Sequence, residues 1–117
     1  MPRANPLRVE GRIIQLRQLL DKDPADEAGW FGLGRALLDL GRPDEAVEPF
    51  RRAVALKSDY TAAFRDLGRA LLESGQHVEA AEVFARAVCL AEKTGDIQTG
   101  REIHVFLRRA ESQVRES

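Results

Sequence analysis

The residue types that most often carry catalysis or bind metals are scarce in this chain. It contains one cysteine, Cys89, and two histidines, His77 and His104, which lie far apart in the sequence. A four-ligand zinc site needs more of these residues, and a single cysteine forms no internal disulfide. We therefore predict no metal site and no reactive thiol. Cys89 is expected to be a small packed or half-exposed residue, with His77 at the start of a helix and His104 on a helix surface.

Three closely spaced glycines at positions 29, 32 and 34 superficially suggest a phosphate-binding loop. Such a loop follows a strand and carries a correctly spaced lysine, whereas these glycines lie inside a helical apolar pattern. The many carboxylates alternate with arginines at helical spacings, which is typical of a solvated, salt-bridged surface. We predict that the protein is not an enzyme and uses no cofactor.

Length and charge narrow the class of protein further. The chain has 117 residues, of which 44% are hydrophobic and 32% charged, so it predicts one globular domain. With 18 basic and 19 acidic residues the formal charge is −1, which disfavours non-specific nucleic-acid binding. Charged and polar residues interrupt residues 1–20, so we expect no signal peptide, no membrane span and a cytoplasmic location. Only three basic residues are lysine, a bias that fits a GC-rich bacterial gene.

The chain contains an internal duplication with a period of 34 residues. When residues 27–60 are placed over 61–94 without a gap, 16 of the 34 pairs are identical. The identical pairs include Leu33/Leu67, Gly34/Gly68, Arg35/Arg69, Gly41/Gly75, Ala46/Ala80, Phe50/Phe84 and Ala53/Ala87. Such a period predicts a stack of repeated structural units.

The residue pattern of each unit predicts two antiparallel helices. In the first unit, Trp30, Leu33 and Leu37 recur at helical spacing, and Gly41 ends the helix. Pro43 then opens a second helix whose inner stripe is Ala46, Phe50 and Ala53, and the second unit repeats the pattern. The short connections make the helices of each pair antiparallel neighbours.

Two features of these helices are unusual. Gly34 and Gly68 lie in mid-helix, where glycine costs about 1 kcal/mol relative to alanine. We expect them to permit close helix approach, against small partners at Ala46, Ala53, Ala80 and Ala87. Pro49 lies inside a helix, where proline removes a hydrogen bond, so a local kink is expected there.

These residues resemble the tetratricopeptide repeat, whose 34-residue unit follows the pattern W-x2-L-G-x2-Y…A-x3-F…P. The residues on that pattern are Trp30, Leu33, Gly34, Ala46, Phe50 and Ala53, and then Phe64, Leu67, Gly68, Ala80, Phe84 and Ala87. The sequence departs from it where Leu37 and Leu71 replace tyrosine and where Ser58 and Glu92 replace the closing proline.

The resemblance extends into the flanking segments. We expect residues 1–6 to be disordered and residues 7–116 to form one domain. Within it we expect a partial first repeat at 7–26, full repeats at 27–60 and 61–94, and a C-terminal capping helix at 96–116. The capping helix would turn Ile103, Leu107, Ala110 and Val114 inward and expose four charged residues, Arg101, Arg108, Arg109 and Glu111. The predicted fold is all-α, a short right-handed α-solenoid of antiparallel helix pairs with about six helices.

The family fold implies a concave face, lined by the first helix of each unit, that holds a partner peptide. The positions carried over are Ala28, Phe31, Arg35, Leu38, Asp39, Ala62, Arg65, Arg69, Leu72 and Glu73. Arg35, Arg65 and Arg69 would form a cationic floor suited to an acidic segment or a free carboxylate. Alternatively, Arg35 and Arg69 pair internally with Asp39, Glu73 or Asp66. Gly32 and Asp66 stand where carboxylate-clamping members of the family have asparagine, so that specialised set is not matched.

Two functions remain open from the sequence. The first is a protein-interaction module that binds a partner peptide or helix in the concave groove. The second is a self-associating module, a monomer or weak homodimer, that pairs through terminal helices with exposed Leu7, Val105 and Phe106. Neither requires nucleic acid, a membrane or a cofactor.

Overall fold

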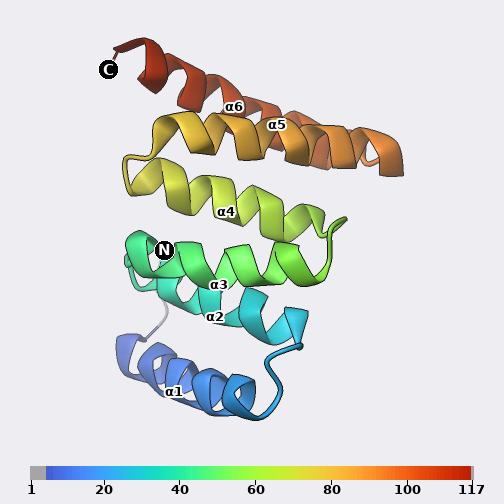
Figure 1. Cartoon of the computed structure of the whole chain (residues 1–117). Coiled ribbons are helices and arrows are strands. Elements are labelled where there is room, and N and C mark those ends of the chain that lie inside the picture. Colours follow the sequence, from blue (N-terminus) through green and yellow to red (C-terminus); the bar gives the residue numbers. More distant parts are fainter. Residues whose placement is uncertain (1–4, 117) are drawn as a thin grey trace.

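The computed structural model describes residues 5–116, which fold into six helices and no strand (Figure 1). The helices are α1 (Pro6–Lys22), α2 (Glu27–Asp39), α3 (Pro43–Leu56), α4 (Thr61–Glu73), α5 (His77–Thr94) and α6 (Ile97–Glu116). Asn5 caps α1 by accepting a hydrogen bond from the Leu7 amide, so this helix begins one residue before the predicted start. The expectation of disorder at residues 1–4 lies outside the described residues.

Local sequence signals set the helix boundaries. Asp26 caps α2 by accepting a hydrogen bond from the Gly29 amide. Gly41 and Gly75 follow α2 and α4 with φ of +72° and +85°, a left-handed conformation that glycine adopts without a Cβ penalty. The α3 helix continues through the buried Pro49 to Leu56, so the proline expected to kink the helix does not end it.

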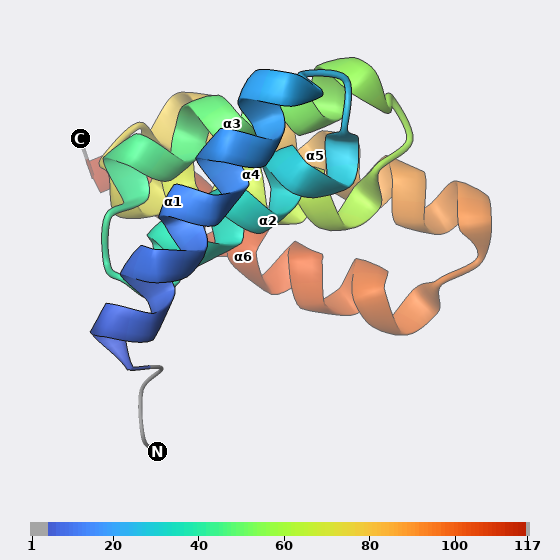
Figure 2. The ribbon, with the colours of Figure 1, turned by 90° about the horizontal axis from the view of Figure 1, so that it is seen from below.

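Each helix packs on the next in chain order, which produces a layered stack rather than a closed bundle (Figure 1). The α2 and α3 helices form one antiparallel pair and α4 and α5 the next, with α1 against α2 and α6 against α5. The α5 and α6 helices are 18 and 20 residues long, whereas α3 and α4 have 14 and 13. The connected ends of α5 and α6 therefore project beyond the other helices (Figure 2).

Gly34 and Gly68 do permit close approach, and the atoms nearest to their Cβ positions belong to aromatic rings, where alanines were expected. A Cβ atom at Gly34 would lie 2.6 Å from Cε1 of Phe50, and one at Gly68 would lie 2.5 Å from Cε1 of Phe84. Both rings are fully buried. The prediction of small partners was wrong because the ring at the centre of each second helix reaches the glycine across the interface.

The α6 helix packs with Ile103 and Ala110 fully buried, while Leu107 and Val114 are half-buried. Its charged residues Arg101, Arg108, Arg109 and Glu111 are exposed, as expected. Phe106, however, is not an exposed residue, because its ring stacks on Phe84 with centroids 5.6 Å apart. Among residues 5–116 no helix is long and apolar enough to cross a bilayer.

Candidate functional site

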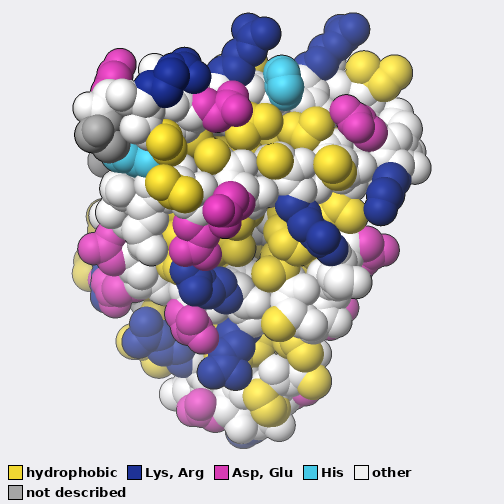
Figure 3. Space-filling model, turned by 45° about the horizontal axis from the view of Figure 1, so that its top comes forward, with side chains coloured by type: hydrophobic (Ala, Val, Ile, Leu, Met, Phe, Trp, Pro, Cys, Tyr) yellow, Lys and Arg dark blue, Asp and Glu magenta, His cyan; other side chains and the backbone are white. Residues whose placement is uncertain are grey.

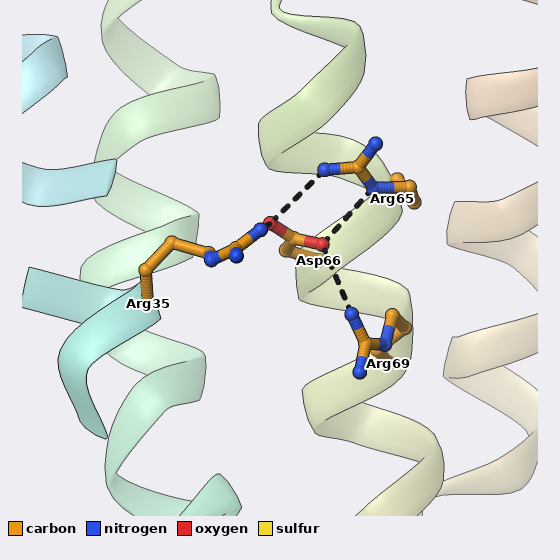
Figure 4. A network of polar contacts seen from close by, with 4 residues as sticks. All are labelled: Arg35, Arg65, Asp66 and Arg69. Carbon is orange, nitrogen blue, oxygen red and sulfur yellow. Dashed lines mark hydrogen bonds and ion pairs between the residues drawn. The ribbon is translucent and has the colours of Figure 1, made fainter. Parts of the chain in front are cut away.

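Three arginines from two neighbouring helices converge on the carboxylate of Asp66 (Figure 4). Arg35 of α2 donates from Nη1 to Oδ2 at 3.1 Å, and Arg65 of α4 donates from Nε to Oδ1 at 3.0 Å. The Nη1 atom of Arg69 lies 3.8 Å from Oδ1, which is an ion pair beyond hydrogen-bond length. The internal pairing left open by the sequence is therefore realised at Asp66.

The arginines of this cluster remain accessible although the carboxylate is not. The Asp66 side chain is 0% exposed, whereas those of Arg35, Arg65 and Arg69 are 43%, 25% and 35% exposed. Three guanidinium groups against one carboxylate leave two formal positive charges in excess. A buried carboxylate that holds partly exposed guanidinium groups in fixed positions prepares them to bind an anionic group.

The same inter-helix contact recurs one unit later with a different partner. Arg69, the counterpart of Arg35, lies over the ring of Phe106 on α6, with Cζ 5.5 Å from the ring centroid. Arg35 thus contacts a carboxylate on the following first helix, and Arg69 contacts an aromatic ring on α6. The face of Arg69 that does not lie on the ring can still donate hydrogen bonds to a ligand.

A cavity of about 490 Å³ extends the arginine cluster toward α1. Four of the predicted groove residues line it, namely Ala28, Phe31, Arg35 and Asp39. Arg8 and Arg12 of α1 line the same cavity, and sequence reasoning missed both. Their spacing of four places them on one helix face, but only the packing of α1 against α2 shows that this face borders the groove.

The other predicted groove residues do not line this cavity. Leu38 and Leu72 are half-buried against the core, and Ala62 is half-buried at the start of α4. Glu73 is exposed at the end of α4. Phe31 packs on Tyr60, with ring centroids 5.1 Å apart. Burial, with Glu27, Asp26 and Asp66 nearby, raises the pKa of Tyr60, so its hydroxyl stays protonated.

The residues considered for catalysis and metal binding are dispersed. Cys89 is exposed on α5, His77 begins α5, and His104 is exposed on α6. Within the described residues no three histidine, cysteine or carboxylate side chains are grouped to hold a metal ion. The three glycines of the loop-like stretch lie inside α2, as the apolar spacing indicated.

Known proteins share this architecture. The TPR2B domain of yeast Sti1, solved in a complex with pHsp70, superposes with a TM-score of 0.79 at 19% identity, covering 86% of this chain and 81% of that chain. The type III secretion translocator chaperone SycD of Yersinia enterocolitica reaches 0.84 at 16% identity, covering 92% and 75%. Protein BPP2914 of Bordetella parapertussis reaches 0.73 at 26% identity, covering 86% and 88%. These likenesses confirm the predicted short α-solenoid of antiparallel helix pairs.

Similarity in sequence to known proteins covers a shorter part of the chain than the similarity in structure. The cytochrome c-type biogenesis protein CycH of Bradyrhizobium diazoefficiens is 35% identical over 51 residues, which are 44% of this chain and 14% of that protein. The chain thus spans a small part of that relative. The family model of the tetratricopeptide repeat matches residues 15–61 and 55–97, together more than half of the chain. The chain therefore belongs to the tetratricopeptide repeat family.

Proposed function

We propose that this chain is a protein-interaction module that binds an acidic segment of a partner along the face formed by α1, α2 and α4. The observation that carries the proposal is the excess of accessible guanidinium groups around one buried carboxylate. The module acts by binding and performs no catalysis. Its cytoplasmic location stays a prediction.

The cluster and the adjoining cavity suit a peptide better than a single small anion. Arg69 lies at one end and Arg12 at the other, with Phe31 and Arg35 between them. Carboxylates of the peptide would accept hydrogen bonds from the arginines, and its apolar side chains would contact Phe31. The contact of Arg69 with Asp66 is longer than a hydrogen bond, so its Nη1 donor is free to bind the peptide, and Arg35 is the most exposed of the three arginines.

A pair of synthetic peptides tests this proposal. A ten-residue peptide rich in aspartate and glutamate is compared, by fluorescence anisotropy, with the same peptide carrying asparagine and glutamine. We expect the acidic peptide to bind at least ten times more tightly. The Arg35→Glu, Arg69→Glu double variant should weaken that binding at least tenfold, whereas Arg101→Glu with Arg108→Glu on α6 should leave it unchanged.

The Arg69→Gln variant distinguishes a loss of binding from a loss of folding. It keeps the two shorter contacts of Asp66, with Arg35 and Arg65, so circular dichroism should show an intact helical fold. The variant should still measurably lower the affinity for the acidic peptide. Equal affinity of the two peptides, or binding unaffected by Arg69→Gln and by the double variant, would refute the proposal that this face binds an acidic segment.

Self-association through a terminal helix is the second candidate. It is favoured by three exposed apolar residues on α1, Leu7, Ile14 and Leu19. Phe106 no longer supports it, because that ring is packed against Phe84. Light scattering over a hundredfold range of concentration separates the two functions. A dimer that dissociates in Leu7→Glu with Ile14→Glu would establish association through α1.

A further inference from the structure

A second groove lies between α5 and α6, on a different part of the molecule from the arginine cluster. It has a volume of about 550 Å³, and its apolar lining includes Val88, Ile97, Gly100 and Val105. Ile97 and Val105 are 69% and 60% exposed. In Figure 3 hydrophobic side chains form a band over this part of the surface, bordered by arginine, histidine and acidic side chains.

The groove lies where α5 and α6 project beyond the rest of the stack. Gly95, Asp96 and Ile97 belong to the projecting turn, which the shorter α3 and α4 lack (Figure 2). In the two preceding layers, α3 covers α2 and α5 covers α4. Among residues 5–116 no helix covers α6 in the same way. The uncovered face of α6 therefore corresponds to the faces of α2 and α4 on which the next helix packs.

The charges along the rim specify what kind of helix fits. Arg101, His104 and Arg108 follow one another at spacings of three and four, so they form one edge of the groove along α6. The two carboxylates of the lining, Glu92 of α5 and Asp96 of the turn, lie at the end of the groove near the turn and not along the α6 edge. A helix lying in the groove would therefore need acidic residues along the edge that faces α6 and an apolar stripe beneath them.

The same charges argue against a second copy of this chain as the occupant. A two-fold pairing would bring the Arg101 and Arg108 edge of one copy against the same edge of the other. The exposed apolar residues of α1 have Arg8 and Arg17 beside them as well as Glu10 and Asp21, so α1 offers an edge of mixed charge rather than an acidic one. The side chains from Ile97 to Arg108 span roughly 16 Å of helix, enough for three turns of a partner helix.

We propose that the groove between α5 and α6 binds an amphipathic helix of another protein, with acidic residues spaced about seven apart facing Arg101 and Arg108. The apolar stripe of that helix packs on Val88, Ile97, Gly100 and Val105. This surface works independently of the arginine cluster around Asp66, so the module has two binding faces.

Two synthetic helical peptides of about 20 residues serve as probes. Both carry leucines at spacings of three and four, and they differ only in one edge, which is glutamate in the first and lysine in the second. Fluorescence anisotropy at low salt measures both against the full chain. We expect the glutamate-edged peptide to bind at least tenfold more tightly, and the Arg101→Glu, Arg108→Glu variant to reverse the preference.

The variant Ile97→Asp with Val105→Asp removes the apolar contact without touching buried residues, so it should keep the fold and lose at least tenfold in affinity. Arg69→Gln is the matched control outside the groove and should leave the affinity unchanged.

Equal affinity for both peptides, or full binding by Ile97→Asp with Val105→Asp, would overturn the proposal. Loss of binding in Arg69→Gln would also overturn it, because the peptide would then occupy the other face. So would a homodimer that Ile97→Asp with Val105→Asp dissociates, since the occupant would then be a second copy.

Discussion

The ring of Phe84 occupies the space that a side chain at Gly68 would need, since a Cβ atom there would lie 2.5 Å from Cε1 of the ring. Phe84 is fully buried and cannot turn away, so we predict that Gly68→Ala destabilises the fold by about 1–3 kcal/mol through overpacking. Urea denaturation followed by circular dichroism measures the free energy of unfolding.

Gly11 offers the matched control for that substitution. It lies within α1, and nothing would contact a Cβ atom at this position within 4 Å. Gly11→Ala should therefore stabilise the protein by up to about 1 kcal/mol, because alanine favours the helix. If Gly68→Ala were as stabilising as Gly11→Ala, the close ring contact would not restrict this position.

Asp66 should be the most sensitive carboxylate of the fold. Replacing it with asparagine keeps its shape but removes the negative charge and turns one of the two oxygens that accept hydrogen bonds from Arg35 and Arg65 into an NH2 donor. We expect Asp66→Asn to lower the free energy of unfolding by about 1.5–3 kcal/mol. Glu48→Gln removes the exposed pair with Arg52 and should cost less than about 1 kcal/mol. Comparable losses in the two variants would contradict this ranking.

Phe106 should hold α6 onto the stack. Its ring stacks on Phe84 and lies beneath the guanidinium groups of Arg69 and Arg109. We predict that Phe106→Ala costs about 3 kcal/mol and increases amide hydrogen exchange along α6. The neighbouring Val105 is mostly exposed, so Val105→Ala should change stability by less than about 0.5 kcal/mol. Exchange that stays slow in Phe106→Ala would show that other contacts suffice.

The start of α6 should respond to acid. Thr99 donates to Asp96 from its hydroxyl at 2.6 Å and from its amide at 3.1 Å, and these hydrogen bonds lower the pKa of Asp96 below its ordinary 3.8. The folded pKa is depressed, so the stabilisation is fully present above this ordinary value and is lost as pH falls through the folded value.

The Asp96→Asn variant isolates this effect, since asparagine also caps helices but does not titrate. The difference in free energy of unfolding between the wild type and Asp96→Asn should favour the wild type at pH 7 and decline below about pH 4. Denaturation series at pH 7, 5, 4 and 3 measure it. A difference that stays constant across the series would show that the carboxylate is not stabilised by its charge.

The sequence by itself determined the helices, their order and the repeated unit. These depend on local signals, because the spacing of Trp30, Leu33 and Leu37 defines a helix face and Gly41 ends it wherever the helix lies. The resemblance to the tetratricopeptide repeat implied that Arg35, Arg65 and Arg69 share one surface. It also left open whether these arginines pair internally, since a helical period says which face a residue shares but not how far its side chain reaches.

Only the tertiary structure decided what those faces meet. Arg35 and Asp66 are 31 positions apart on different helices, and they pair because α2 and α4 lie close together in the stack. The rotation of α6 about its own axis likewise turned Phe106 toward Phe84, although the apolar pattern also allowed it to face solvent. The orientation of each helix about its axis, and the contacts that its side chains make, depend on the volumes of the side chains across each interface, because protein interiors are closely packed. No local pattern in one helix contains that information.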